Sequence, residues 1–219
     1  MYVKTIMKKN PLTISPEASF YEARALIRDK GIRHLPVVDK KHHIVGILTD
    51  RDIRTAAPSD ATTLSIHEIH YILGKLQVSS FMTPADKLVT VTPDTTFEKA
   101  VQLMHDYKIG CLPVLDGREL VGIVTETDVL ETFVDVMGLK VEGTRLTLAL
   151  EDEPGKVHDI LEVIKRYNVN LISVYTSSYK VEGKRIVVFR IRTHEYEDIV
   201  KEIEKLGYTV LAVDKWPST

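Results

Sequence analysis

Apolar residues recur in the first third of the chain with spacings that predict a helix followed by a two-stranded hairpin. Apolar positions three and four residues apart over Ala18–Asp29 predict the helix, and Gly31 follows it as a typical helix stop. Two short runs rich in β-branched residues, Leu35–Val38 and Ile44–Leu48, flank a polar turn at 39–43. They predict the paired strands of a hairpin.

The pattern returns in the second third of the chain, so that residues 7–53 and 82–129 form an internal repeat. Identical residues lie 77 positions apart in the two copies: Thr13, Pro16, Ala23, Leu26, Ile32, Leu35, Pro36, Val37 and Asp39 match Thr90, Pro93, Ala100, Leu103, Ile109, Leu112, Pro113, Val114 and Asp116. After a one-residue deletion, Gly46, Thr49 and Asp52 match Gly122, Thr125 and Asp128. Repeats fix an architecture, so we expect the two copies to pack together with pseudo-twofold symmetry.

A polar segment joins the copies and ends in a predicted helix. Ser65 and Glu68 have the spacing of a capping box, from which we expect a helix that runs to about Leu76. His67 and His70 lie one turn apart on it. Two histidines at that spacing can bind zinc, but no third ligand stands nearby in the sequence. A role on the surface or at an interface is the other reading.

The last third of the chain has the order strand, helix, strand, strand, helix, strand, which is the ferredoxin-like arrangement. The first strand alternates apolar and polar residues, and the first helix has apolar residues at helical spacing. The predicted elements are a strand over 145–150, a helix over 157–164 that Asn168 stops, strands Leu171–Ser178 and Arg185–Arg192, a helix over Tyr196–Leu206 and a strand over Tyr208–Val213. The expected fold class is therefore α+β.

Composition narrows the classes of function. The 219 residues carry a formal net charge of −2, with a pI near 6.5, which removes the general electrostatic reason to expect nucleic acid as a partner. No uncharged apolar run approaches the ~18 residues of a membrane span, and the first residues lack the apolar core of a signal peptide. The single cysteine, Cys111, cannot form an internal disulfide, so we expect a cytoplasmic protein.

Each repeat follows its second predicted strand with a Thr-x-x-Asp motif, at Thr49 and Asp52 and again at Thr125 and Asp128. A carboxylate accepts both hydrogens of a ribose diol, and a hydroxyl beside free amides at a helix start suits a phosphate. A glycine three residues before each threonine would let a ligand approach the strand backbone closely. The motif is also a simple helix N-cap, and the two readings are compatible.

The two copies resemble the CBS domain pair, a regulatory unit also called the Bateman module, over residues 1–136. The resemblance rests on the Leu-Pro-Val strands at 35–37 and 112–114 and on the runs 46–52 and 122–128. It implies that the cleft between the repeats binds a regulatory adenosine-containing ligand: AMP, ADP, ATP or S-adenosylmethionine. The positions that it assigns to this ligand are Thr13, Ile14, Arg33, His34, Leu35, Pro36, Thr49, Arg51, Asp52, Thr90, Val91, Cys111, Leu112, Pro113, Thr125 and Asp128.

The copies differ at the positions that the resemblance places beside the ligand phosphates. Arg33-His34 in the first copy becomes Gly110-Cys111 in the second, and Arg51 becomes Thr127. We therefore expect two unequal sites, in which Arg33, His34 and Asp52 together favour a phosphorylated ligand. The alternative is that one site is degenerate and empty. No acid or base partner stands at a fixed spacing from Cys111, which favours a packed thiol over a nucleophile.

The last third of the chain resembles an ACT domain over residues 143–214, because of the turn 152–155 and the run 168–171. The resemblance implies that two copies pair edge to edge and bind an amino acid at their interface. The positions assigned to the amino acid are Asp152, Gly155, Val157 and Asn170. A Pro-Gly turn also forms without any ligand, so dimerisation alone is the other reading.

The order of these parts resembles the acetoin-utilisation protein B family, which implies a link to growth on acetoin or butanediol. We place the first repeat at 1–60, the inter-repeat helix at 61–77, the second repeat at 78–136, a glycine-flanked linker at 137–142 and the ACT domain at 143–214. No catalytic triad, metal-ligand pattern or P-loop is present, so we expect a non-catalytic sensor that requires no cofactor. We expect a homodimer that signals through its ACT domain or an unknown protein target. A constitutive scaffold and an amino-acid sensor are the alternatives.

Overall fold

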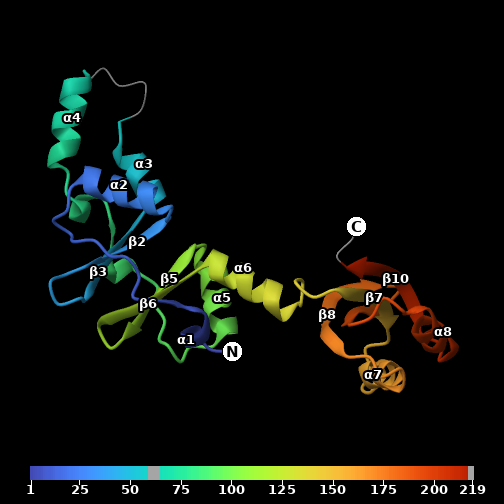
Figure 1. Cartoon of the computed structure of the whole chain (residues 1–219). Coiled ribbons are helices and arrows are strands. Elements are labelled where there is room, and N and C mark those ends of the chain that lie inside the picture. The colour runs from blue at the N-terminus through green and yellow to red at the C-terminus, as the bar shows by residue number, and fades with distance from the viewer. Residues whose placement is uncertain (59–64, 217–219) are drawn as a thin grey trace. The chain divides into compact units, whose positions relative to one another are not determined.

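The computed structural model describes residues 1–58 and 65–216. The chain divides into two compact units, Met1–Val129 and Leu130–Thr219, which we describe separately (Figure 1). The first unit contains both repeats. The helix α6 (Glu126–Val136) begins in the first unit and ends in the second.

The first repeat folds as predicted into a helix and a hairpin. The helix α2 (Phe20–Lys30) starts at a capping box of Ser19 and Glu22 and ends at Gly31, whose φ of 61° is left-handed. Antiparallel strands β2 (His34–Val38) and β3 (Ile44–Thr49) follow, and then α3 (Asp50–Ala56). The helix α4 (Ile66–Lys75) begins after the Ser65 capping box and packs against α2 (Figure 1).

The second repeat has the same order. It contains α5 (Phe97–Tyr107), β5 (Cys111–Asp116), β6 (Glu119–Thr125) and then α6, with two short 3-10 turns before α5 at Val78–Ser80 and Ala85–Lys87. Each repeat has a buried core between its helices and its hairpin. A smaller buried cluster of Ile47, Cys111 and Ile123 joins residues of both hairpins.

Two short strands cross between the repeats, and the periodicity of the sequence did not predict them. The short helix α1 (Val3–Ile6) and the strand β1 (Lys8–Lys9) lie at the start of the first repeat, but β1 pairs with β6 of the second repeat. The strand β4 (Thr83–Pro84) lies at the start of the second repeat but pairs with β3 of the first. Each hairpin therefore gains its third strand from the start of the other repeat.

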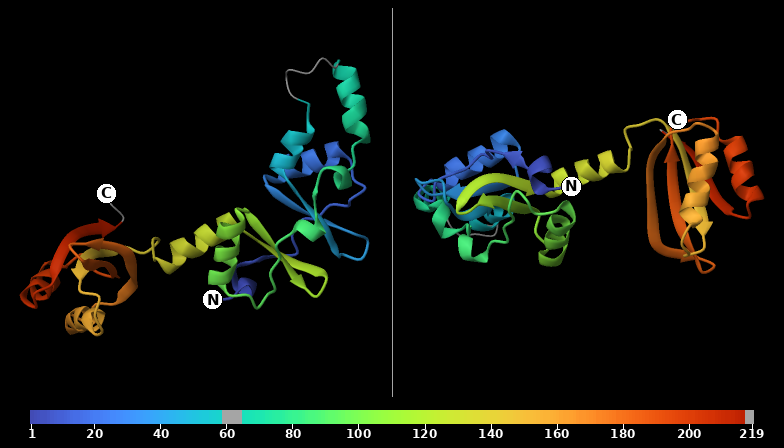
Figure 2. Two further views of the ribbon diagram at one scale, coloured as in Figure 1. Left: turned by 180° about the vertical axis from the view of Figure 1, so that it is seen from behind. Right: turned by 90° about the horizontal axis from the view of Figure 1, so that it is seen from below.

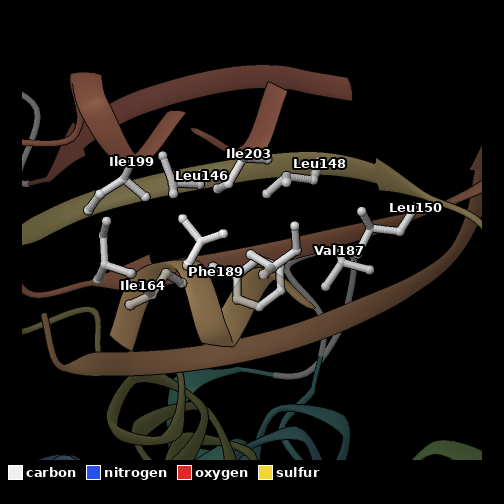
Figure 3. Close-up of a cluster of buried hydrophobic side chains, with 11 residues drawn as sticks. Leu146, Leu148, Leu150, Ile164, Val187, Phe189, Ile199 and Ile203 are labelled. Atoms are coloured by element: carbon white, nitrogen blue, oxygen red, sulfur yellow. The ribbon is translucent and has the colours of Figure 1, made fainter. Parts of the chain in front are cut away.

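The second unit has a four-stranded antiparallel sheet in the order β10-β7-β9-β8, which confirms the predicted ferredoxin-like fold. The strands are β7 (Gly143–Leu150), β8 (Leu171–Val181), β9 (Lys184–Ile191) and β10 (Thr209–Trp216). Helices α7 (Lys156–Arg166) and α8 (Glu197–Lys205) cover one face of the sheet (Figure 2). Figure 3 shows the core between them, where side chains such as Leu146, Phe189 and Ile203 are completely buried.

The segment 137–142, which we predicted as a linker, is held against the C-terminal sheet by its carbonyl groups. Ser173 Oγ donates to the Met137 carbonyl at 3.0 Å, and Trp216 Nε1 donates to the Leu139 carbonyl at 2.6 Å. Arg190 Nη2 donates to the Val141 carbonyl at 3.1 Å. These contacts make the segment a part of the second unit.

Candidate functional site

Each Thr-x-x-Asp motif forms a helix cap. Thr49 and Thr125 lie at the ends of β3 and β6, directly before α3 and α6. Asp52 Oδ2 accepts hydrogen bonds from the Thr49 amide at 2.8 Å and from its hydroxyl at 2.7 Å. Asp128 Oδ2 accepts the same pair of bonds from Thr125, at 2.8 and 2.6 Å. The N-cap reading of the motif is thus confirmed, and the ligand reading stays a prediction.

Two clefts lie beside these motifs, and we name them by their threonines. The Thr49 cleft has a volume of about 360 Å³ and is lined by His34, Ile47, Thr49, Thr83, Lys87, Leu88, Val89, Tyr107, Lys108, Ile109, Gly110, Cys111 and Pro113. The Thr125 cleft has a volume of about 510 Å³ and is lined by Lys8, Lys9, Asn10, Pro11, Leu12, Gly31, Ile32, Arg33, His34, Gly110, Ile123, Thr125, Glu126 and Thr127. Each cleft combines the threonine of one repeat with the turn before the first hairpin strand of the other.

This exchange corrects the predicted grouping of Arg33, His34 and Asp52. Arg33 lines the Thr125 cleft, whereas Thr49, to which Asp52 is hydrogen-bonded, lines the other cleft beside Gly110 and Cys111. His34 lines both clefts. The physical reason is the pseudo-twofold arrangement, in which the motif of one repeat faces the hairpin start of the other. Neighbours within one repeat of the sequence therefore belong to different clefts.

Lysines that the sequence comparison missed change the charge of both clefts. Lys8 and Lys9 of the crossing strand β1 line the Thr125 cleft, together with Arg33 and one acidic residue, Glu126. Lys87 and Lys108 line the Thr49 cleft beside Gly110 and Cys111, which the second copy has in place of Arg33 and His34 and which we had expected to bring no cation. Lys87 and Lys108 escaped notice because they have no counterpart in the first repeat, where Asn10 and Gly31 occupy the positions 77 residues earlier. Both clefts are therefore cationic.

His34 does not add a charge to this set near neutral pH. Burial lowers the pKa of the His34 imidazole, and the carboxylates of Asp50 and Glu126 oppose that shift only in part. The neutral ring still offers one donor and one acceptor to a ligand. The prediction that His34 is a cationic donor is therefore corrected, and Arg33 supplies the charge at this position.

Cys111 is a packed thiol. Its side chain is 7% exposed and lies between Ile47 and Ile123. Burial, with a smaller effect of the Glu126 carboxylate, raises the pKa of Cys111 to about 12. A thiol with this pKa is a poor nucleophile at neutral pH, as the sequence had indicated.

Several predicted ligand positions serve the core or lie off the clefts. Leu35 and Leu112 are completely buried, and Ile14 and Val91 also belong to the cores. Of the two prolines, Pro113 lines the Thr49 cleft, while Pro36 lies buried in β2, where its carbonyl accepts from the Ile14 amide. The predicted residues that line neither cleft directly are Thr13, Ile14, Leu35, Pro36, Arg51, Asp52, Thr90, Val91, Leu112 and Asp128.

The glycines before the motifs make room for the crossing strands, which corrects their predicted role toward a ligand. A Cβ on Gly46 would lie 2.6 Å from Met82 Sδ and 2.7 Å from the Thr83 carbonyl oxygen. A Cβ on Gly122 would lie 2.7 Å from Met7 Sδ and 3.1 Å from the Lys8 carbonyl oxygen. The close approach at each glycine is therefore made by the other repeat's leading segment.

The predicted amino-acid positions of the second unit do not converge within one chain. Asp152, after β7, forms an ion pair with Arg185 at 2.8 Å, and Gly155 caps α7 with a φ of 92°. Val157 packs against the core. Asn170 lies at the opposite end of the sheet, because β8 starts opposite Ile191 whereas the end of β7 lies opposite Arg185.

Of the two histidines considered as zinc ligands, His67 and His70 of α4, His70 contacts Tyr21 of α2. His70 Nδ1 lies 2.8 Å from the Tyr21 hydroxyl, and their rings stack with centroids 5.9 Å apart. Within the described residues, no three His, Cys, Asp or Glu side chains gather so that they could hold a metal ion.

Comparison with known families identifies both units. The family model of the CBS domain matches residues 3–59 and 78–135. The chain belongs to the CBS-domain family. The model of the TTHA0829-like ACT domain matches residues 142–214, so that the CBS pair is followed by an ACT domain. Both families are regulatory.

A longer protein is similar to most of the chain. An inosine-5'-monophosphate dehydrogenase of Korarchaeum cryptofilum is 30% identical over 215 residues, which are 92% of this chain and 41% of that protein. The chain thus spans less than half the length of this relative.

Two crystal structures are also similar to the CBS pair. One, of an acetoin utilization protein (AcuB) from Vibrio cholerae, is 26% identical with a TM-score of 0.54, and the match covers 64% of this chain and 95% of that one. The other, of CBSX2 in complex with AMP, is 26% identical with a TM-score of 0.52, and the match covers 61% and 96% of the two chains. In the described part of the chain, no helix is both long enough and apolar enough to cross a membrane.

Proposed function

We propose that the chain is a non-catalytic regulatory protein whose CBS pair binds an adenine nucleotide. The candidates are AMP, ADP, ATP and S-adenosylmethionine, with the signal passed to the ACT domain or to a protein partner. A homodimer in the cytoplasm and a link to acetoin or butanediol utilisation belong to the same proposal. The similarity to the Vibrio cholerae protein supports that link.

The observation that carries the proposal is the matched pair of clefts. Each has a threonine hydroxyl on its wall, together with at least two side chains of lysine or arginine. Volumes of about 360 and 510 Å³ lie within the range of small-molecule sites in proteins. A similar CBS structure contains AMP, which supports an adenosine-bearing ligand. The described residues that line the clefts include no set of nucleophile, base and orienting group, so we propose binding and not catalysis.

Calorimetric titration of the full chain with AMP tests the proposal. We expect about two molecules bound per chain, with GMP as the competitor nucleotide that binds more weakly. Thr49→Val and Thr125→Val each remove one hydroxyl from a cleft wall. Each should weaken its own site about tenfold, the lower end of the range of about 1.5–3 kcal/mol for a hydrogen bond to a charged group, because the hydroxyl must give up its bond to the aspartate to donate to a phosphate. Asp106→Asn, on the exposed face of α5, is the matched control and should leave both sites unchanged.

A thermal melt separates the sensor from a constitutive scaffold. A ligand that binds only the folded chain raises its stability by RT ln(1 + [L]/Kd), so AMP, ATP or S-adenosylmethionine at a hundred times Kd should add about 2.7 kcal/mol. Asp52→Ala should reduce that gain at the Thr49 cleft. If none of these compounds moves the melting temperature of the wild-type chain, the scaffold reading replaces the sensor.

A further inference from the structure

We propose that Lys8 makes the Thr125 cleft selective for phosphorylated adenosine ligands, whereas the Thr49 cleft also accepts ligands without a phosphate. This inference rests on the proposed function, because it concerns which adenosine compounds each cleft takes. Its basis is an ion pair that one repeat has and the other lacks.

Lys8 reaches the motif of the second repeat from the crossing strand. It pairs with Ile123 in β6, lines the Thr125 cleft, and places its Nζ atom 3.4 Å from Asp128 Oδ1. The Asp128 side chain is only 6% exposed, while the lysine side chain is 64% exposed. Since Oδ2 is occupied by Thr125, a ligand hydroxyl that donates to Oδ1 competes with the Lys8 ammonium.

The first repeat has no such competitor. Thr83 occupies the position of Lys8, because it pairs with Ile47 in β3 as Lys8 pairs with Ile123 in β6. Thr83 lines the Thr49 cleft but carries no charge. Asp52 forms no ion pair with a lysine or arginine in the described part of the chain. A ribose can therefore bind Asp52 without displacing a cation.

The ion pair turns the second motif into a filter. Separating a buried carboxylate from its cation is costly, so a ribose alone gains little at Asp128. A ligand with a phosphate gives the displaced ammonium a new anionic partner, and Lys9 and Arg33 on the same wall add to the attraction despite Glu126. Adenosine has no phosphate and would leave the Lys8 ammonium without an anionic partner. The cleft therefore discriminates against adenosine through the cost of an unpaired charge.

The test compares AMP with adenosine in a chain whose Thr49 cleft is disabled by Asp52→Ala. In this parent we expect AMP to bind at least tenfold tighter than adenosine. Lys8→Met should weaken AMP about tenfold, the value of one charge-assisted hydrogen bond, and should leave adenosine equal or tighter. Lys9→Met is the matched control: it removes a charge from the same wall but frees no carboxylate, so adenosine should not bind tighter.

A transfer experiment tests the same inference in the other cleft. In a chain with Asp128→Ala, Thr83→Lys should shift the Thr49 cleft toward AMP and away from adenosine. Lys8→Arg keeps the positive charge and should retain the preference of the Thr125 cleft for AMP. If Lys8→Met does not fold, Thr83→Lys still tests the inference independently.

The outcomes distinguish this inference from the proposed function. If AMP and adenosine change by the same factor in Lys8→Met, or if Thr83→Lys leaves their ratio unchanged, Lys8 is not the filter. If the wild-type chain binds neither compound, the proposed function itself is wrong.

Discussion

One carboxylate oxygen of Asp52 and one of Asp128 cap a helix. In both residues Oδ2 accepts the amide and hydroxyl hydrogens of the capping threonine. The Oδ1 atom of Asp128 lies 3.4 Å from Lys8 Nζ, and the proposed ligand contact of both aspartates is made by Oδ1. Under the proposed function the capping residue is also the binding residue, so that its replacement should change both stability and affinity. For this reason the variants above need the ligand-free melting temperature as a reference.

Cys111 allows a prediction about reactivity at a single residue. Burial raises its pKa to about 12, from an ordinary value of 9.0, so the thiolate fraction near pH 8 falls about a thousandfold. We expect Ellman's reagent to modify the native chain at least a thousandfold more slowly than the chain in urea. Because this is the only cysteine, the signal has one source. Equal rates in the native and unfolded chains would show that the thiol is accessible.

At the residue scale, the sequence identified several residues that line the clefts, but it did not predict which of the two clefts each residue lines. Thr49, Thr125, Arg33 and Cys111 all line clefts, as their positions in the repeat suggested. Their distribution over two clefts could not be derived, because it depends on how one hairpin faces the other. Lys87 and Lys108 were missed for a related reason: a comparison of repeats finds what is shared, and these cations are not shared.

At the scale of elements, the crossing strands β1 and β4 connect the repeats more closely than the pattern of the sequence suggested. Long helices and strands show periodicity over many residues. Those for which we predicted bounds end within a few residues of the predicted positions. A two-residue strand has no periodicity to read. It is specified by its partner, here a hairpin edge that is exposed only once the other repeat has folded.

Substitution of the two motif glycines tests these crossings. Gly46→Ala places a methyl group within 2.7 Å of the Thr83 carbonyl oxygen in β4, and β4 cannot move without breaking its pairing with β3. We expect a loss of about 1–3 kcal/mol in the free energy of unfolding, the usual cost of overpacking, measured by urea denaturation. Gly122→Ala should do the same through Met7 and Lys8.

Gly74 provides the control for that loss. It lies inside α4, where an added Cβ meets no atom within 4 Å. Because alanine favours a helix over glycine, Gly74→Ala should stabilise the chain by up to about 1 kcal/mol. If Gly46→Ala raised the free energy of unfolding as Gly74→Ala is expected to do, the close contact with Met82 and Thr83 would not oppose a side chain at this position.

At the scale of the whole molecule, the cores define two cooperative units. The buried cores of the CBS pair contain residues from Val3 to Val124, and the ACT core contains residues from Leu146 to Ile203. No described residue belongs to both sets. Each unit thus gains its hydrophobic stabilisation from its own residues, and a nucleotide should raise the stability of the CBS pair first.

The independence of the ACT domain depends on where it is cut. A fragment that starts at residue 137 retains the carbonyls of Met137, Leu139 and Val141, which accept hydrogen bonds from the sheet. A fragment that starts at residue 143 loses all three. In this shorter fragment Arg190 also loses its acceptor, the Val141 carbonyl. Arg190 is 2% exposed, and its Nε already lacks a hydrogen-bond partner in the described chain.

We therefore expect both fragments to fold, with the shorter one less stable by about 2–4 kcal/mol. This value corresponds to three hydrogen bonds of about 0.5–1.5 kcal/mol each. Urea unfolding followed by circular dichroism gives the difference, and a fragment from residue 130 serves as the reference because it adds chain without removing any of these contacts. Equal midpoints for the fragments from 137 and 143 would mean that the segment is only a tether. A fragment from 137 that fails to fold would mean that the ACT core needs the CBS pair.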